Sequence, residues 1–195
     1  MLGLAIVAVA VAAFGHPERA YPVPAGSALP ENAAAQAARL DRRLERFAPT
    51  GVWVTIDTYR NRITVLRGDK VLREAACSTG SGVLLKDPSG ERQWVFQTPL
   101  GERRVLNKRK NPVWKKPDWA FIEEGFEPPK DWRLRTDDFS LGDYALDLGD
   151  GYLIHGTIFQ TLLGRPVTHG CIRVGDKDLE YVYRTVPYGA RVVLF

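Results

Sequence analysis

Apolar and polar positions alternate along the chain from residue 52 onward, and this period of two predicts β-strands. Every second residue from Val52 to Ile56 is apolar, and the alternation resumes over 63–66 and 71–72 after short turns. Strands joined by such short turns predict an antiparallel meander. Further strands are expected at 103–106, 141–148 and 191–195.

Two segments show the spacing of a helix instead. Between Glu31 and Phe47 apolar residues recur every three or four positions, and Pro30 stands where the first turn of a helix would begin. This helix is interpreted as packing or spacing and is assigned no chemistry. A second, shorter helix is expected over 176–184, where three apolar side chains share one face.

The N-terminal stretch is apolar without either periodicity. Residues 2–14 form an unbroken run of apolar or small residues, shorter than the about 20 that cross a membrane but matching the about 7–15 of a signal-peptide core. Small residues near its end suit cleavage, although only Met1 precedes it. We expect 1–14 to be a signal or N-terminal anchor, with export and possible membrane association, and 15–50 to be linker and helix. The alternative is a buried strand or helix of the domain.

Composition narrows the class of protein. Apolar content is 45%, charged content is 26%, and the chain of 195 residues is long enough to bury a core without disulfides. A net charge of +4 favours contact with an anionic surface. The basic residues do not form the concentrated stripe of a nucleic-acid binder. We therefore expect no nucleic-acid partner, and we also expect no cofactor.

Residues 107–140 have a different composition, with four prolines, three tryptophans and a basic run at 108–116. A segment this long and Pro-rich is expected to be a loop, and long loops in compact domains are usually lids, binding loops or disorder. The tryptophans argue against disorder. The segment is interpreted as one wall of a cleft, or alternatively as a satellite core beneath a long loop.

Reactive side chains are concentrated between residues 152 and 174. This stretch contains His155, His169, Cys171 and Arg173, in a chain with only 3 His and 2 Cys. Their density predicts that the chemistry of the protein is located here. Cys77, in an apolar strand, is expected to be a buried structural cysteine, although a disulfide between the two cysteines is the alternative.

A cysteine acts as a nucleophile through its thiolate, which an imidazole can generate by taking the proton. Either His155 or His169 would serve, and the residues alone do not choose between them. The main-chain N–H groups of Gly170 and Cys171 are candidate donors to an oxyanion, and Arg173 can bind a carboxylate through its two-pronged guanidinium. A metal site made by the three His and Cys side chains is an alternative, but no CxxC or HExxH pattern supports it.

These motifs resemble the L,D-transpeptidase catalytic domain, also called the YkuD domain. The central match is His-Gly-Thr at 155–157 followed by Thr-His-Gly-Cys-Ile-Arg at 168–173. Ser-Thr-Gly at 78–80, Thr-Pro-Leu-Gly at 98–101 and Leu-Gly at 141–142 resemble further segments of the family. Thr168 stands where Ser is commoner, and the resemblance covers about residues 51–195.

The resemblance implies a fold and a set of roles. The fold would be mainly β, a mixed β-sandwich with a few short helices and a long Pro/Trp-rich cleft loop, and the catalytic domain would span 51–195. Cys171 would be the nucleophile and His155 its proton acceptor and donor, oriented by the Gly156 carbonyl, while His169 and Gly170 would shape the oxyanion region. The substrate-binding residues would be Arg173, Gly156, Thr157 and Thr168.

The implied reaction is acyl transfer on peptidoglycan stem peptides in the cell envelope. Cys171 would attack a tetrapeptide stem, D-alanine would leave, and an amine from a second stem or an envelope protein would take the acyl group. Two alternatives remain open. One is a carboxypeptidase or amidase-type hydrolase that uses the same cysteine, and the other is a non-catalytic peptidoglycan-binding module, against which the intact reactive set argues.

Overall fold

The computed structural model describes residues 32–45 and 49–195, and the chain divides into two compact units, 1–48 and 49–195. In the first unit the expected helix is present as α2 (Ala33–Glu45). The signal or anchor segment expected at 1–14 lies outside the described residues, as does most of the linker. None of the helices in the described ranges has the length and apolar character needed to cross a membrane.

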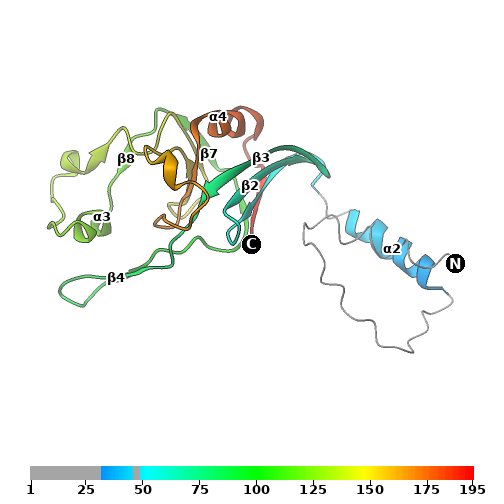
Figure 1. Cartoon of the computed structure of the whole chain (residues 1–195), viewed down its shortest axis with the longest axis horizontal. Helices are drawn as coiled ribbons and strands as arrows, with labels where there is room; N and C mark the ends of the chain where they lie inside the picture. The colour runs from blue at the N-terminus through cyan, green and yellow to red at the C-terminus, as the bar shows by residue number, and fades with distance from the viewer. Residues whose placement is uncertain (1–31, 46–48) are drawn as a thin grey trace. The chain divides into compact units, whose positions relative to one another are not determined.

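The second unit is built on one sheet of nine strands with mixed directions (Figure 1). The mainly β fold expected from the sequence is therefore confirmed. In spatial order the strands are β6 (Gly101–Arg104), β13 (Arg191–Leu194), β1 (Val52–Asp57), β2 (Arg62–Arg67), β3 (Lys70–Ser78), β12 (Ile172–Val174), β11 (Leu153–His155), β10 (Tyr144–Asp147) and β7 (Asn107–Lys110).

The predicted antiparallel meander is present as β1, β2 and β3. Two other pairs are parallel: β1 lies beside β13, and β11 lies beside β12. Parallel neighbours require a long crossover connection, and the one between β11 and β12 is the loop 156–171 with the short 3₁₀ helix η2 (Gln160–Leu162). The pairing of β11 with β12 places the two ends of the reactive stretch, residues 152–174, side by side.

The hydrophobic core lies on one face of the sheet, beneath α4 (Asp176–Thr185). The helix turns Leu179 and Val182 inward, and both are 1% exposed. The strands contribute alternate residues to the same core, as a period of two requires; these include Val54, Ile56, Ile63, Val65, Cys77, Ile154, Ile172, Val174, Val192 and Leu194.

Two excursions leave the main sheet on the same side of the domain (Figure 1). The first is a hairpin of β4 (Leu84–Lys86) and β5 (Gln93–Val95), which the sequence did not predict. The second is the segment 107–140, which is more structured than the long loop expected there. After β7 it forms β8 (Trp114–Lys115), α3 (Asp118–Glu123), the 3₁₀ helix η1 (Trp132–Arg135) and β9 (Thr136–Asp137).

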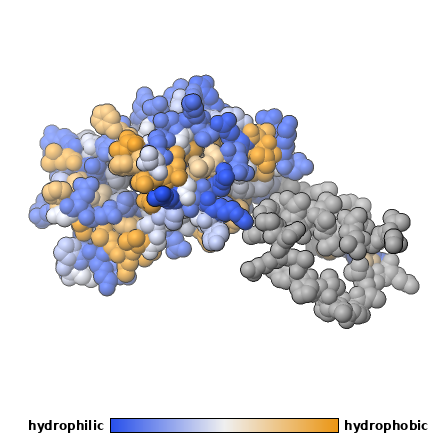
Figure 2. Space-filling model, in the orientation of Figure 1, coloured by the Kyte–Doolittle hydropathy of each residue, from blue (hydrophilic) through white to orange (hydrophobic). Residues whose placement is uncertain are grey.

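The surface of the domain mixes polar and apolar patches on the face seen in Figure 2. Both excursions contribute exposed apolar side chains, among them Leu84, Val95, Phe126, Trp132, Leu134 and Phe139. The segment 107–140 is therefore more apolar at its surface than its basic run suggests.

Candidate active site

Strand pairing places the reactive side chains on one face of the sheet. In the parallel register Ile154 lies opposite Ile172 and His155 opposite Arg173. Both isoleucines are fully buried in the core, and successive side chains of a strand point to opposite faces. His155 and Arg173 therefore lie side by side on the face away from the core. Cys171, which immediately precedes β12, shares that face.

The same argument separates the two cysteines. Cys77 pairs with Val174 and is fully buried in the core. Burial raises the pKa of its thiol to about 12, with a further upward effect from Asp57 and a smaller downward one from Arg62. Both cysteines are free, so the disulfide alternative is not realised. Cys77 is a core residue, as expected.

The thiol of Cys171 is held in its neutral form. Burial raises its pKa, although the main-chain N–H of Leu153 and the charge of Arg173 act in the opposite direction. The Sγ atom lies 3.6 Å from the carbonyl oxygen of Gly151, in the geometry of a weak S–H···O contact. At rest the Cys171 side chain is therefore a neutral thiol.

The imidazole of His155 is buried and lacks a hydrogen-bond partner at Nδ1. Burial and the neighbouring Arg173 charge lower its pKa from 6.5 to about 4, while the main chain of Gly156 acts upward. The main chain of Gly156, expected to orient the ring through its carbonyl, is thus close enough to raise the His155 pKa. It does not complete a hydrogen bond with Nδ1. An unpartnered nitrogen in a buried ring is a costly feature, and it is typical of a functional site.

The loop that carries Cys171 is fixed by two threonine hydroxyls. Thr168 Oγ1 donates to the carbonyl of Cys171 at 2.6 Å and accepts the N–H of Gly170 at 3.1 Å. Thr98 Oγ1 donates to the carbonyl of Gly170 at 2.8 Å and accepts the N–H of Gly80, also at 2.8 Å. The Gly170 N–H, expected to be open to an oxyanion, is therefore already bonded in this structure.

Gly170 is required by its backbone. Its φ is +123°, and a Cβ there would lie 2.9 Å from Tyr152 Cε1 and 3.1 Å from the carbonyl oxygen of Gln97. Because L side chains rarely adopt this conformation, glycine alone fits. The peptide that joins Gly170 to Cys171 is planar, so fixing its carbonyl on Thr98 also fixes the direction of the Cys171 N–H.

A buried asparagine supports this loop from the first hairpin. Asn61 has a φ of 53° and is 3% exposed, and its Oδ1 accepts both the N–H (3.0 Å) and the hydroxyl (2.8 Å) of Thr79. Thr79 in turn accepts the N–H of Thr168 at 2.9 Å. Sequence reasoning assigned no role to Asn61 and noted Thr98 only within the Thr-Pro-Leu-Gly segment that resembles the family, so both supporting roles were missed.

His169 is turned toward α3. Its ring stacks on Trp119 with centroids 4.3 Å apart, meets Phe96 edge-on at 4.5 Å, and places Nε2 2.7 Å from Oε2 of Glu123. The His169 ring is therefore held by contacts with Trp119, Phe96 and Glu123. The segment 107–140 therefore contacts the site through Trp119 and Glu123.

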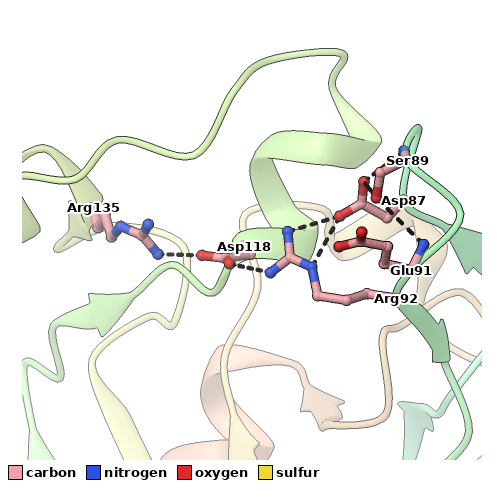
Figure 3. Close-up of polar contacts among 6 residues, drawn as sticks. All are labelled: Asp87, Ser89, Glu91, Arg92, Asp118 and Arg135. Carbon is pink, nitrogen blue, oxygen red and sulfur yellow. Dashed lines mark hydrogen bonds and ion pairs between the residues drawn. The ribbon is translucent and has the colours of Figure 1, made fainter.

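The opposite end of α3 is anchored by charge (Figure 3). Asp118 lies between two arginines, with 2.6 Å contacts to Arg92 of the β4–β5 hairpin and to Arg135 at the end of η1. Arg92 also pairs with Asp87 of the same hairpin at 2.7 Å. Hydrogen bonds from Arg135 and Arg92 lower the pKa of Asp118. The two excursions are thus joined at the first turn of α3.

The remaining predicted residues surround the site. Gly156 donates its N–H to the Leu141 carbonyl at 2.7 Å. Thr157 is 5% exposed, and its hydroxyl accepts the Phe159 N–H at 3.0 Å. In the part of the chain that the structure describes, no group of three His, Cys, Asp or Glu side chains is placed to hold a metal ion.

The sequence is similar to that of known proteins. The L,D-transpeptidase catalytic domain family (YkuD) matches residues 51–194. The probable L,D-transpeptidase YbiS of Escherichia coli K12 is 31% identical over 116 residues, which are 58% of this chain and 38% of that protein. The putative L,D-transpeptidase YqjB of Bacillus subtilis is 28% identical over 150 residues, 77% of this chain and 74% of that protein.

The fold is also found among solved structures. L,D-transpeptidase 3 of Mycobacterium tuberculosis, in complex with a faropenem-derived adduct, aligns with a TM-score of 0.54 at 21% identity, covering 74% of this chain and 60% of the other. The chain spans less than two fifths of the E. coli relative's length. Since the family match covers most of the chain, the chain belongs to the L,D-transpeptidase catalytic domain family.

Proposed function

We propose that the protein is a cysteine-dependent L,D-transpeptidase that acts on peptidoglycan stem peptides. The observation that carries the proposal is the arrangement on β11 and β12. A free Cys171 and a buried His155 with an unpartnered ring nitrogen share one face of two adjacent strands, beside the guanidinium of Arg173.

The pair rests uncharged. At neutral pH the pKa of about 4 keeps His155 as a free base, and the raised pKa of Cys171 keeps it a thiol. Proton transfer therefore has to accompany formation of the C–S bond. Burial is the larger cause of the low His155 pKa, and the Arg173 charge is the second. A substrate carboxylate bound to Arg173 would offset this second cause, so donor binding itself would make His155 a stronger base.

Attack on the carbonyl between the third and fourth stem residues forms an oxyanion. The Cys171 N–H, aimed through the Thr98 contact to Gly170, is proposed to donate to it. His155, now protonated, gives its proton to the leaving nitrogen, the C–N bond breaks, and D-alanine departs with a thioester left on Cys171. An acceptor amine then attacks the thioester, its proton passes to His155 and on to the departing sulfur, and the thiol is restored.

Arg173 and the neighbouring loop are proposed to position the donor. Among the described residues the guanidinium makes no ion pair within 4.0 Å, although it is half-buried. It is therefore suited to a planar carboxylate of the stem. Gly156, Thr157 and Thr168 would line the approach or hold its shape. The cell envelope is the proposed location, with 51–195 as the catalytic domain.

Intact-mass spectrometry tests the proposal on the full chain. Incubation with faropenem is expected to add one adduct, located on Cys171 by peptide mapping. Cys171→Ala should abolish the adduct, whereas the matched variant Cys77→Ala should retain it. An adduct that survives in Cys171→Ala would refute the nucleophile assignment.

A second experiment separates transfer from hydrolysis. With a tetrapeptide stem and an amine acceptor, the proposal predicts a cross-linked product together with free D-alanine. Tripeptide and D-alanine without any cross-link would favour the hydrolase instead. Absence of both products, with a correctly folded protein, would favour the binding module.

A further inference from the structure

The helix α3 presents two side chains to the same imidazole. Trp119 and Glu123 are four residues apart and so lie on one face of the helix. Trp119 stacks on the His169 ring, and the Glu123 carboxylate meets its Nε2 at 2.7 Å. Their common partner is two residues from Cys171, so a carboxylate from the segment 107–140 is held within the active-site region.

The charge of the Glu123 carboxylate also acts on Arg173. Burial lowers the pKa of Arg173, and Cys171 and Glu123 act in the opposite direction. Within 32–45 and 49–195, Glu123 is the carboxylate that acts on the guanidinium in this way. The Glu123 side chain is 43% exposed, so water and a ligand can compete for it.

The first turn of α3 does not depend on Glu123. Asp118 is held by Arg92 and Arg135, each at 2.6 Å (Figure 3). Releasing Glu123 from His169 would therefore free the last turn of the helix while the first turn stays joined to the β4–β5 hairpin. The chain thus contains a carboxylate that contacts the His169 imidazole, and its charge also acts on the Arg173 guanidinium.

We propose that Glu123 occupies the place of a substrate carboxylate beside His169, and that an anionic donor peptide must displace it to reach Cys171. Glu123 is then a specificity-determining residue. Glu123 would keep weakly bound anions away from the Cys171 thiol. A donor would displace it only where its other contacts with the protein bring its carboxylate to Arg173. This inference rests on the proposed function for the identity of the donor, but not for the competition itself.

Two alkylating reagents of similar size test the competition without any turnover. Iodoacetate carries a carboxylate, iodoacetamide does not, and both modify a reactive thiol. Rates of modification at Cys171 would be followed by intact mass, since Cys77 is fully buried and silent in the folded protein. The informative quantity is the ratio of the two rates, because a change in thiol reactivity alone cancels from it.

Glu123→Gln is expected to raise the iodoacetate-to-iodoacetamide ratio by about three- to tenfold, as removal of one nearby charge allows. Glu124→Gln is the matched control, since it removes the same charge one residue away without a His169 contact, and it should change the ratio less than about twofold. Equal ratios in wild type and Glu123→Gln, or an equal rise in both variants, would overturn the inference.

Steady-state kinetics with a tetrapeptide donor then separate this inference from the proposed function. Glu123→Gln should lower KM for the donor several-fold with little change in KM for the acceptor. If the ratio rises and no donor reacts, the competition stands and the transpeptidase proposal fails. If donors react normally and the ratio is unchanged, the transpeptidase proposal stands and the role of Glu123 fails.

Discussion

Thr98 joins three segments of the active site through a single hydroxyl. It is 4% exposed, accepts the Gly80 N–H, and donates to the Gly170 carbonyl. Thr98→Val keeps the shape of the side chain and removes both bonds. The Gly170 carbonyl is then buried without this partner, and the Gly80 N–H is left partly buried.

Each orphaned group costs about 1–3 kcal/mol. Because Gly80 is only partly buried and the loop can relax, we expect Thr98→Val to lower the free energy of unfolding by about 2–4 kcal/mol in total. Thr98→Ser retains the hydroxyl and loses one methyl, which costs about 1 kcal/mol. Urea unfolding followed by tryptophan fluorescence would measure both variants against wild type.

The chemical effect should exceed the effect on stability. With the Gly170 carbonyl released, the Cys171 N–H is no longer aimed, and loss of an oxyanion donor slows acyl chemistry strongly. Thr98→Val should form the faropenem adduct at least about tenfold more slowly than Thr98→Ser under folding conditions. If the two variants unfold within about 0.5 kcal/mol of each other and react at equal rates, Thr98 is not the positioning residue argued above.

Two further predictions concern burial and close packing. Because the folded-state pKa of His155 is about 4 and its ordinary value is 6.5, the unfolded chain binds this proton first as pH falls. The free energy of unfolding should therefore drop by about 3 kcal/mol more in wild type than in His155→Asn between pH 7 and pH 4; parallel curves would contradict the buried neutral ring. A Cβ at Gly80 would lie 2.5 Å from main-chain atoms of Phe96 and Thr98, whereas one at Gly51 meets nothing within 4 Å. Gly80→Ala should thus lower thermal stability by at least about 3 kcal/mol or prevent folding, and Gly51→Ala should stay within about 0.5 kcal/mol; similar melting temperatures would show that the Gly80 loop can move aside.

The sequence predicted which segments form strands better than it predicted which strands pair with one another. Alternation located the first three strands, because half-buried strands require it, and an apolar run located the final one. It could not show that β13 pairs in parallel with β1, since periodicity specifies a strand's faces and not its partner. β7 was missed because all four of its residues, Asn107–Lys110, are polar and show no alternation, as suits an edge strand.

The residues of the candidate site also differ in whether the sequence could predict them. Cys171, His155 and Arg173 could be named from a local motif, and strand pairing then placed them on one face. Asn61 and Thr98 act through contacts with residues far away in the chain, and although Thr98 belongs to a segment that resembles the family, neither position showed these contacts in advance. Glu123 gave no signal at all, because its importance comes from the His169 ring that tertiary packing brings to it.

The pairing of β1 with β13 has a consequence for how the protein is made. Val54, on the first strand, lies opposite Val192, and both are fully buried. A ribosome-bound chain that has emerged only as far as β12 therefore lacks one neighbour of β1, and the core on that side stays open. Folding of the domain should be completed only after residues 191–194 have been released. Because β13 is synthesised after the other strands of the sheet, the core of the nascent chain would remain incompletely packed until then.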